Sequence, residues 1–352
     1  MRIVPLGFST GRRLGLAAAG LLLFFLLVWQ PGVGSPGPAT SAAAPAAWAA
    51  AKTPEGATRT VREPISPIPR RIDYDPAKAE LGRRLFHETM LSVDHSVSCA
   101  SCHDLDGGGH DPRPVSIGIH GREGNMASPT VFNAVFNFRQ FWNGRAVDLQ
   151  EQAAGPLQDP LEMGMSKEEV EQRLSADQDY RTTFGQIYGG RQVRFEQVVD
   201  ALAEFQRALI TPDSPFDLYL RGEAVLQPHQ QLGYLEFKEL GCVTCHNGVN
   251  IGGNSYQQMG VIYPREERKD REIQDRRAIT GREADRQVFK VPTLRNIALT
   301  APYFHDGSAA DLPEALQIMA HHNLGVELTS QQIFALVAFM ETLTGQKPAI
   351  LR

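Results

Sequence analysis

The sequence predicts an all-α fold in two domains, and three observations support this prediction. Apolar residues recur at helical spacing in several segments, whereas runs that alternate apolar and polar residues are scarce. The pattern Cys-x-x-Cys-His occurs twice, and its two histidines are 143 residues apart, about the size of one small domain. The 23 prolines and 32 glycines fall mainly between the helical segments, so we expect long ordered loops.

The first domain is expected over residues 72–212. Its predicted helices are 76–86, 168–174 and 195–209. In the last of these, Val198, Leu202 and Phe205 recur at helical spacing and predict a buried face. The turn-rich residues 211–215 end this domain.

The second domain is expected over residues 213–352. A helix over 228–240 leads into the second cysteine pair, and a further helical segment covers 312–322. Thr329 and Gln332 have the spacing of a capping box and open a helix over 330–343, which Gly345 and Pro348 terminate.

Composition narrows the class of protein. Of the 352 residues, 42% are hydrophobic and 21% are charged, which is typical of a globular chain. The net charge of −5 argues against general nucleic-acid binding, and four cysteines are too few for a disulfide scaffold.

The N-terminus resembles an export signal. Arg12 and Arg13 precede an apolar run, 14–29, that is short for a membrane span of ~20 residues. We therefore favour a cleaved signal peptide within residues 1–30 over a retained membrane anchor. A buried core helix fits less well, because a Pro/Ala-rich linker follows over 31–71. Without the first 30 residues the net charge is −8, which would suit a basic protein partner.

The two cysteine motifs predict covalently bound haem. They are Cys99, Cys102 and His103, and Cys242, Cys245 and His246. In this pattern the two thiols attach to the vinyl groups of one porphyrin, and the histidine binds the iron. A thioredoxin-like redox pair or half of a zinc site would use similar residues. Two copies, each with its histidine, favour two c-type haems. Haem c is attached on the outer side of a bacterial membrane, which agrees with export to the periplasm.

The surroundings of the motifs predict that the two irons differ. Candidate sixth ligands after the second motif are Met259, His305, Met319, His321 and His322. After the first motif, His110 and His120 lie in a glycine-rich loop, 107–124, that could leave the iron open. An iron that binds a small substrate needs an open position, whereas an electron-transfer iron usually has both axial positions filled.

Several segments between residues 72 and 345 match a known family. They are Leu91-Ser92, Ser-Pro-Thr-Val-Phe-Asn-Ala at 128–134, Gln-Phe-Trp-Asn-Gly-Arg at 140–145, Gln-Ala-Ala-Gly-Pro at 152–156, Leu-Glu-Met at 161–163, Phe-Lys-Val-Pro-Thr-Leu-Arg-Asn at 289–296 and Leu-Thr-Ala-Pro-Tyr-Phe-His-Asp-Gly at 299–307. Through them the chain resembles the bacterial diheme cytochrome c peroxidases and the related enzyme that matures methylamine dehydrogenase.

The resemblance implies two facing cytochrome c domains with different haems. The haem on His103 would be the low-potential peroxidatic one, and the haem on His246 would be the high-potential one, with Met319 as sixth ligand. Glu162 matches the family's distal acid/base and Gln152 its pocket glutamine. Trp142 matches the tryptophan between the haems. The maturation enzyme has Tyr in place of the ligand Met, so Met319 favours the peroxidase branch.

The resemblance also implies partners. They are hydrogen peroxide and a small electron-donor protein, either a cytochrome c or a cupredoxin; a homodimer is compatible with it. The charged run 265–286 alternates in sign and predicts a solvated surface loop rather than a donor-docking site. Two other functions stay open: a maturation-type oxygenase that acts on a partner protein, and a non-catalytic diheme electron carrier.

Two departures from the family pattern affect these expectations. The family's switchable distal His commonly follows Ser-x-Gly directly, but here Ile119 separates Gly118 from His120. His120 would ligate the first iron only through a shifted loop; otherwise that iron is permanently open and needs no prior reduction. The family often binds calcium between the domains through an Asn, and this chain has Ala127 there with Asn125 nearby. Calcium is therefore a weakened expectation.

Overall fold

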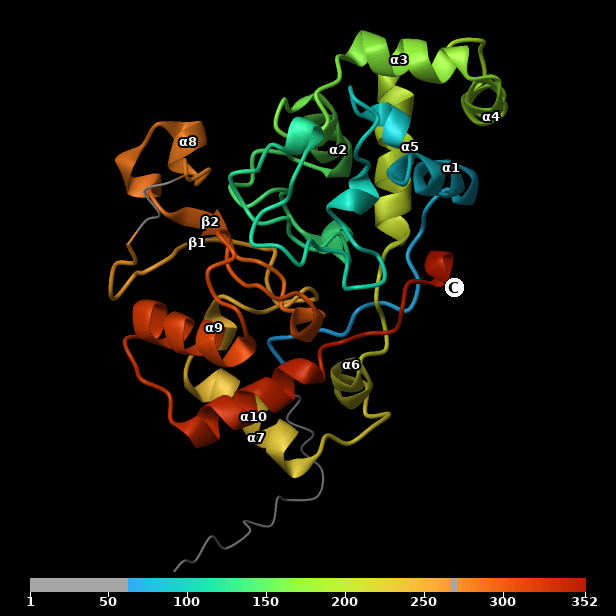
Figure 1. Cartoon of the computed structure of the whole chain (residues 1–352). Coiled ribbons are helices and arrows are strands. Elements are labelled where there is room, and N and C mark those ends of the chain that lie inside the picture. The colour runs from blue at the N-terminus through green and yellow to red at the C-terminus, as the bar shows by residue number, and fades with distance from the viewer. Residues whose placement is uncertain (1–62, 267–270) are drawn as a thin grey trace, which may run out of the picture. The chain divides into compact units, whose positions relative to one another are not determined.

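Several helices begin where the sequence supplies a capping side chain. The computed structural model describes residues 63–266 and 271–352 (Figure 1). The carboxylate of Asp75 accepts hydrogen bonds from the first amides of α1 (Pro76–Phe86). The predicted capping box of Thr329 and Gln332 opens α10 (Ser330–Glu341), and Ser166 opens α3 (Lys167–Ala176) in the same way.

The helix-rich fold predicted from the sequence is confirmed. The other helices are α2 (Leu149–Gln158), α4 (Gln178–Tyr188), α5 (Phe195–Ala208), α6 (Pro215–Leu220), α7 (Pro228–Glu239), α8 (Arg277–Thr280) and α9 (Leu312–Met319). Two short strands, β1 (Tyr256–Gln258) and β2 (Val288–Lys290), pair antiparallel and form the one sheet of the described residues. Several short 3₁₀ turns and long loops connect these elements.

The core is divided into two large hydrophobic clusters. The first is formed by side chains between Leu81 and Leu209, and the second mainly by side chains between Phe216 and Leu343. Each end of the described chain packs against the cluster formed by the other half. Ile65 belongs to the second cluster, whereas Ile350 and Leu351 pack against the first. Figure 1 shows the C-terminal turn beside α1, which belongs to the first cluster.

A glycine permits each cluster's central helix pair to cross closely. A Cβ on Gly82 of α1 would lie 1.9 Å from the carbonyl oxygen of Ala201 on α5. A Cβ on Gly233 of α7 would lie 1.9 Å from the carbonyl oxygen of Ala335 on α10. In both pairs, phenylalanines one turn further along the two helices are also in contact, with ring centroids 5.2 and 5.3 Å apart. The two halves therefore use the same crossing.

Two proline-threonine segments repeat a second local structure. The Thr130 hydroxyl donates to the carbonyl of Gly108 at 2.6 Å, and the Thr293 hydroxyl donates to the carbonyl of Asn250 at 2.7 Å. Three residues after each threonine, Asn133 and Asn296 adopt positive φ, 61° and 60°. Both asparagine side chains donate to the one hydroxyl of Thr211, at 2.7 and 3.0 Å. The described residues thus contain an internal repeat whose two halves meet at Thr211.

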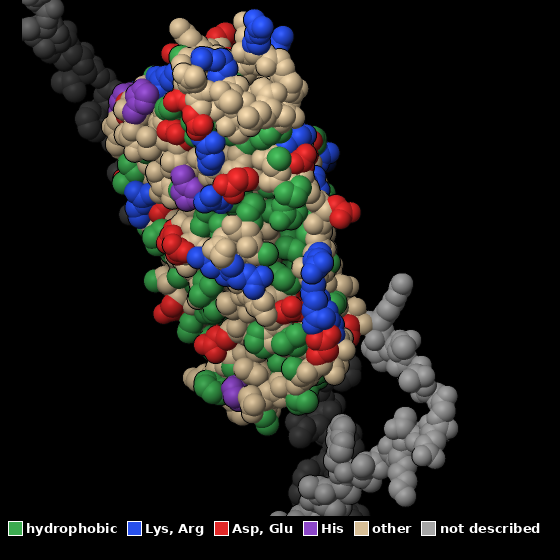
Figure 2. All heavy atoms as spheres, turned by 90° about the vertical axis from the view of Figure 1, so that its right-hand side faces the viewer, with side chains coloured by type: hydrophobic (Ala, Val, Ile, Leu, Met, Phe, Trp, Pro, Cys, Tyr) green, Lys and Arg blue, Asp and Glu red, His purple; other side chains and the backbone are tan. Residues whose placement is uncertain are grey.

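The described surface is mixed in charge. On the face in Figure 2, Lys and Arg side chains are interspersed with Asp and Glu. The predicted solvated run 265–286 carries local ion pairs, such as Arg277 with Glu283, and most of its described residues are exposed. Among the described residues, no helix has the length and hydropathy to cross a membrane. The apolar run 14–29 and most of the linker lie outside the described residues.

Candidate active site

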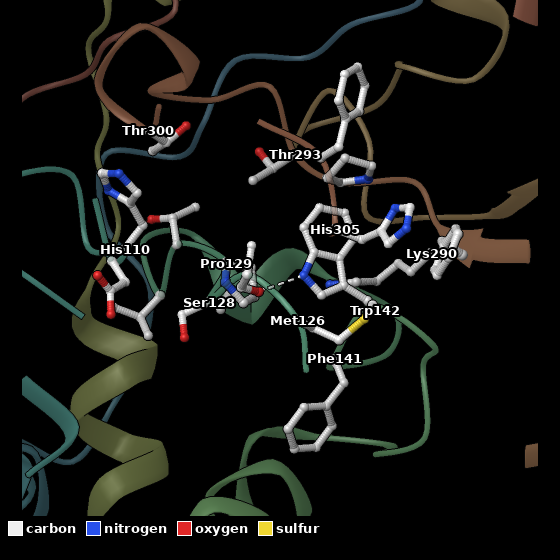
Figure 3. Close-up of a pocket in the computed structure, with 18 of the residues that line it drawn as sticks. His110, Met126, Ser128, Pro129, Phe141, Trp142, Lys290, Thr293, Thr300 and His305 are labelled. Atoms are coloured by element: carbon white, nitrogen blue, oxygen red, sulfur yellow. Dashed lines mark hydrogen bonds between the residues drawn. The ribbon is translucent and has the colours of Figure 1, made fainter. Parts of the chain in front are cut away.

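One cavity of about 600 Å³ brings together residues from both halves of the chain. Both Cys-x-x-Cys-His motifs line it, together with Trp142, Gln152, Glu162 and Met319. Figure 3 shows Trp142, His305 and Lys290 grouped on one side of the close-up and His110 and Thr300 on the other. All predicted site residues except His120 therefore surround this cavity.

The first motif presents its histidine, His103, to the cavity. Cys99 begins a 3₁₀ turn (Cys99–Ser101), and the His103 amide donates to the Cys99 carbonyl at 3.0 Å, which fixes their spacing. His103 Nδ1 is 3.2 Å from the carbonyl oxygen of Gly109. Burial lowers the pKa of His103 to about 4, so the imidazole is neutral at pH 7. With its proton on Nδ1, the ring offers the Nε2 lone pair to a metal.

The second motif has the same geometry. The His246 amide donates to the Cys242 carbonyl at 3.0 Å, and His246 Nδ1 is 3.3 Å from the carbonyl oxygen of Ile251. Burial lowers the pKa of His246 to about 4 as well. The four cysteines form no disulfides among themselves. A neutral, oriented imidazole beside two thiols at the wall of a largely apolar cavity fits a c-type haem in each half.

Met319 lies at the last position of α9, where the helix passes into a wider turn (Ala320–Leu324). Of the five candidate sixth ligands, Met259, His305 and Met319 line the cavity. His321 instead contacts Glu327, and His322 Nδ1 lies 2.7 Å from the carbonyl oxygen of Tyr263. The structure therefore leaves only these three candidates at the cavity wall, Met319 among them.

Glu162 is placed by a turn that follows α2. Its amide donates to the carbonyl of Asp159 at 3.0 Å, and its own carbonyl accepts from the amide of Ile119 at 2.9 Å. Burial, with a smaller contribution from Asp159, raises the pKa of Glu162 to about 7, although Arg145 opposes the shift. A carboxyl group with this pKa can both take up and release a proton at neutral pH.

The loop that carries His120 packs directly on this turn. A Cβ on Gly118 would lie 2.0 Å from the carbonyl oxygen of Leu161, so only glycine permits this approach. The Arg122 guanidinium also donates to the carbonyl of Pro160 at 3.0 Å. Loop 116–124 and the turn bearing Glu162 thus form one packed unit.

His120 points away from the cavity. Its side chain is 54% exposed, and its Nδ1 lies 3.2 Å from the carboxylate of Asp94, which also accepts from the His120 amide. His120 has a positive φ of 55°, which allows this outward turn. Ligation by His120 stays a prediction, and the conformation seen here does not bring it to the cavity. His110 does line the cavity, where its Nε2 lies 2.8 Å from the carbonyl oxygen of Ala301.

Trp142 is held at the junction between the halves. Its indole Nε1 donates to the carbonyl of Ala127 at 2.8 Å, and its ring meets His305 edge-on with centroids 6.3 Å apart. His305 in turn stacks on Phe289, with centroids 4.2 Å apart. Figure 3 shows the Trp142 hydrogen bond and the neighbouring His305. Trp142 is therefore fixed between segments of both halves.

Calcium at this junction stays a prediction. The described residues contain no group of three or more His, Cys, Asp or Glu side chains that could hold a metal ion. The carbonyl oxygens of Ala127 and Ala301 are used by Trp142 and His110. An ion here would depend on backbone and amide oxygens alone.

Two cavity residues were not singled out by the sequence analysis. Arg145 lies over the ring of Phe141, 3.4 Å from its centroid, and Lys290 is buried at the cavity wall. Both lie inside segments that carry the family resemblance, but a single Arg or Lys in such a segment has no spacing pattern that would indicate a role in the site. Only the fold shows that they face the site.

The paired motifs and the shared cavity define a class of redox protein with two c-type haems. A family model described as di-haem cytochrome c peroxidase matches residues 76–225. The chain is 45% identical over 287 residues to cytochrome c551 peroxidase of Nitrosomonas europaea, covering 81% of this chain and 85% of the relative. It is 40% identical over 305 residues to cytochrome c551 peroxidase of Pseudomonas aeruginosa, covering 84% of each.

A solved structure agrees with these relatives. A MauG-like protein associated with microbial copper homeostasis superposes with a TM-score of 0.70 at 31% identity, covering 80% of this chain and 93% of that protein. The chain belongs to the di-haem cytochrome c peroxidase family. It is an enzyme of the peroxidase class, as the sequence analysis predicted.

Proposed function

We propose that this chain is a periplasmic peroxidase that reduces hydrogen peroxide to two water molecules. The reaction consumes two electrons and two protons, and the electrons come from a small cytochrome c or a cupredoxin. The observation that carries the proposal is the shared cavity. It joins two haem-attachment motifs to a carboxyl group, Glu162, whose pKa is about 7 because it is buried.

The assignment of haem-binding residues follows from the cavity wall. Cys99 and Cys102 would hold one haem by thioether bonds, and Cys242 and Cys245 the other, each half acting as one cytochrome c domain. His103 and His246 would be the proximal iron ligands, and Met319 would be the sixth ligand of the iron bound by His246. When bound, the two haems supply the one-electron redox chemistry, and the protein sets their ligation, access and potential.

Glu162 would move the proton that peroxide cleavage requires. Its ionised carboxylate accepts a proton from one peroxide oxygen and returns it to the other oxygen, which leaves as water. A group with a pKa near the working pH performs both steps without a large energetic cost in either direction. Gln152, on α2, lines the same cavity, and its amide offers both a donor and an acceptor to hold the small polar substrate.

Trp142 would lie on the path between the two redox sites. The indole is fixed by its hydrogen bond to Ala127 and by its edge contact with His305, which belongs to the other half. A rigid aromatic group at this junction shortens the gap that an electron must cross. Such a position also makes the tryptophan part of the packing.

The direct test compares the glutamate at the cavity with one outside it. We expect E162Q to lower peroxide turnover, with reduced cytochrome c as donor, by about 10²–10⁴-fold, the usual contribution of a general acid–base group. Glu168 is exposed in the first turn of α3 and lies outside the cavity, so E168Q should keep wild-type turnover. Equal turnover of E162Q and wild type would remove Glu162 from the proposed role.

The same assay separates the other two functions. The similarity to a MauG-like structure makes a maturation-type oxygenase the second candidate. That enzyme would oxidise a partner protein in preference to reduced cytochrome c. A non-catalytic carrier would show two low-spin haems that stay low-spin after partial reduction and addition of peroxide. A high-spin haem that turns over peroxide with reduced cytochrome c as the electron donor contradicts both alternatives.

A further inference from the structure

Lys290 is a buried cation without a partner among the residues that the structure describes. The residue is 6% exposed, at the end of β2, and its side chain lines the cavity beside Trp142 (Figure 3). Its ammonium group makes no hydrogen bond or ion pair among the described residues. Lysine is rarely buried without an opposite charge, because the ammonium group loses its hydration.

The backbone around Lys290 is tied to the junction. The Lys290 amide donates to the carbonyl of Trp142 at 2.7 Å, and the residue pairs with Tyr256 in the short sheet. These contacts fix the Cα of Lys290 at the cavity wall. Because the residue is only 6% exposed, its side chain lies along that wall and not in bulk solvent.

The internal repeat shows what is unusual about this position. Lys290 precedes Pro292 by two residues, as Ala127 precedes Pro129. The Ala127 amide donates to the carbonyl of His305 at 2.8 Å, which matches the bond from Lys290 to Trp142. The two halves thus exchange equivalent hydrogen bonds. One half places a cation at the junction, and the other places a methyl group there.

Burial has not removed the charge. Desolvation lowers the pKa of Lys290 to about 8, which still leaves the ammonium form in excess at pH 7. The labelled side chains beside it in Figure 3, Trp142 and His305, carry no carboxylate, and no charged group of the described residues perturbs it. A carboxylate on the molecule that fills the cavity would supply the missing counter-ion.

We propose that Lys290 forms an ion pair with a propionate carboxylate of one of the two haems, and that this pair raises the reduction potential of that haem. The proposal rests on the proposed function in one respect, namely that both motifs carry haem. A nearby positive charge stabilises the ferrous form, which carries one positive charge less than the ferric form. Because the repeat supplies no second cation at Ala127, the effect is asymmetric and contributes to the difference between the haems.

The test measures reduction potentials and haem content rather than activity. We expect K290M, with a neutral side chain of similar length, to load two haems and to show a lower potential for one of them in spectroelectrochemical titration. The resonance Raman propionate band of that haem should shift. K290R should keep both near their wild-type values. K167M removes an exposed lysine of α3 that lies outside the cavity and should change neither.

Each outcome decides the proposal. One of the two haems changes its reduction potential in K290M, and its spin state in the spectrum shows which haem carries the paired propionate. Unchanged potentials and propionate bands in a fully loaded K290M would overturn the pairing. If K290M and K290Q both lose a haem while K290R keeps two, the charge is required and the proposal stands. If K290R loses it too, the side chain acts by packing and the proposal fails. A wild-type chain without two haems would instead refute the proposed function.

Discussion

Glu162 shows how burial can give a common residue the pKa that the proposed proton carrier needs. An exposed glutamate has a pKa near 4.3 and is ionised at neutral pH. Here burial raises the pKa of Glu162 to about 7, and the neighbouring charges of Asp159 and Arg145 act in opposite directions. The residue is chemically ordinary, and its function depends on the turn that places it in the cavity.

This pKa predicts the pH dependence of peroxide reduction. Glu162 must be ionised to accept the first proton, so kcat/KM for peroxide should be constant above about pH 7 and fall about tenfold per pH unit below it. The sign follows from the raised pKa: acid protonates the base and removes it. Stopped-flow measurements from pH 5 to 9 check this, and in E162Q the fall of kcat/KM below pH 7, the acid limb of the profile, should be absent. An unchanged acid limb in E162Q would show that another group causes the fall.

His120 gives the second prediction at this scale. Because its side chain faces solvent and contacts Asp94, we expect the fully oxidised enzyme to turn over peroxide without prior reduction. H120A should change the initial rate by less than about twofold, since no cavity contact is lost. Rates are compared with and without a reduction step before peroxide is added. A long lag in the oxidised wild type that H120A abolishes would show that His120 does ligate the iron.

At the scale of elements, the packing of one loop against a turn determines where Glu162 lies. Loop 116–124 contacts the turn bearing Glu162 through the close approach of Gly118 and the hydrogen bond from Ile119. A side chain at Gly118 would collide with the carbonyl of Leu161, so the turn would have to move. Since Glu162 belongs to this turn, its place in the cavity depends on the loop.

A pair of glycine variants tests this dependence. We expect G118A to lower kcat by at least tenfold and to displace the acid limb of the pH profile, because the Cβ would lie 2.0 Å from the Leu161 carbonyl oxygen. Gly124 is the matched control in the same loop, since a Cβ there would be 3.5 Å from the nearest atom. G124A should behave like wild type. Equal kinetics for the two variants would mean that the loop does not position Glu162.

The helices differ in how well the sequence predicts them. Where a cap and an apolar stripe coincide, as at Thr329 and at Asp75, the predicted starts agree with the structure. Helix α2 contains Pro156 and has a weak apolar face, so its pattern gives little signal. Helix α6 begins at Pro215 directly after the cap Ser214, and the same residues were interpreted as a turn. Proline after serine suits both a turn and the first helical position.

The close crossing of helices can be tested through stability. G82A should lower the free energy of unfolding by about 1–3 kcal/mol, because the added methyl group would lie 1.9 Å from the Ala201 carbonyl oxygen. G185A in α4 meets its nearest atom at 3.2 Å and should be much milder. Guanidinium unfolding of the two holoproteins measures the difference. Equal losses would show that the α1–α5 crossing can relax at little cost.

For the molecule as a whole, the sequence predicts the parts of the site but not their arrangement. The cysteine motifs predict both attachment sites because two copies of Cys-x-x-Cys-His are typical of c-type haem attachment. The sequence carries signs of the internal repeat, since Pro-Thr-x-x-Asn occurs at 129–133 and at 292–296, but other equivalent positions differ, such as Trp142 and His305 or Lys290 and Ala127. At the positions that differ, the equivalence is seen in the backbone hydrogen bonds from Ala127 to His305 and from Lys290 to Trp142, which do not depend on the side chain. The asymmetry of the redox sites therefore lies in side chains placed on a symmetric backbone.

The size of the cavity makes a last prediction about the whole fold. Without haem, the mainly apolar side chains that line this cavity of about 600 Å³ would face water instead of packing against a prosthetic group. Their burial would then no longer stabilise the fold, and the total stability of an ordinary domain is only about 5–15 kcal/mol. We therefore expect the chain made without haem attachment to keep helical far-UV circular dichroism but to lose near-UV signal and cooperative unfolding. The matched control is the same chain matured with haem c. A haem-free chain that unfolds in one sharp transition with a native near-UV spectrum would show that the two hydrophobic clusters suffice to hold the fold.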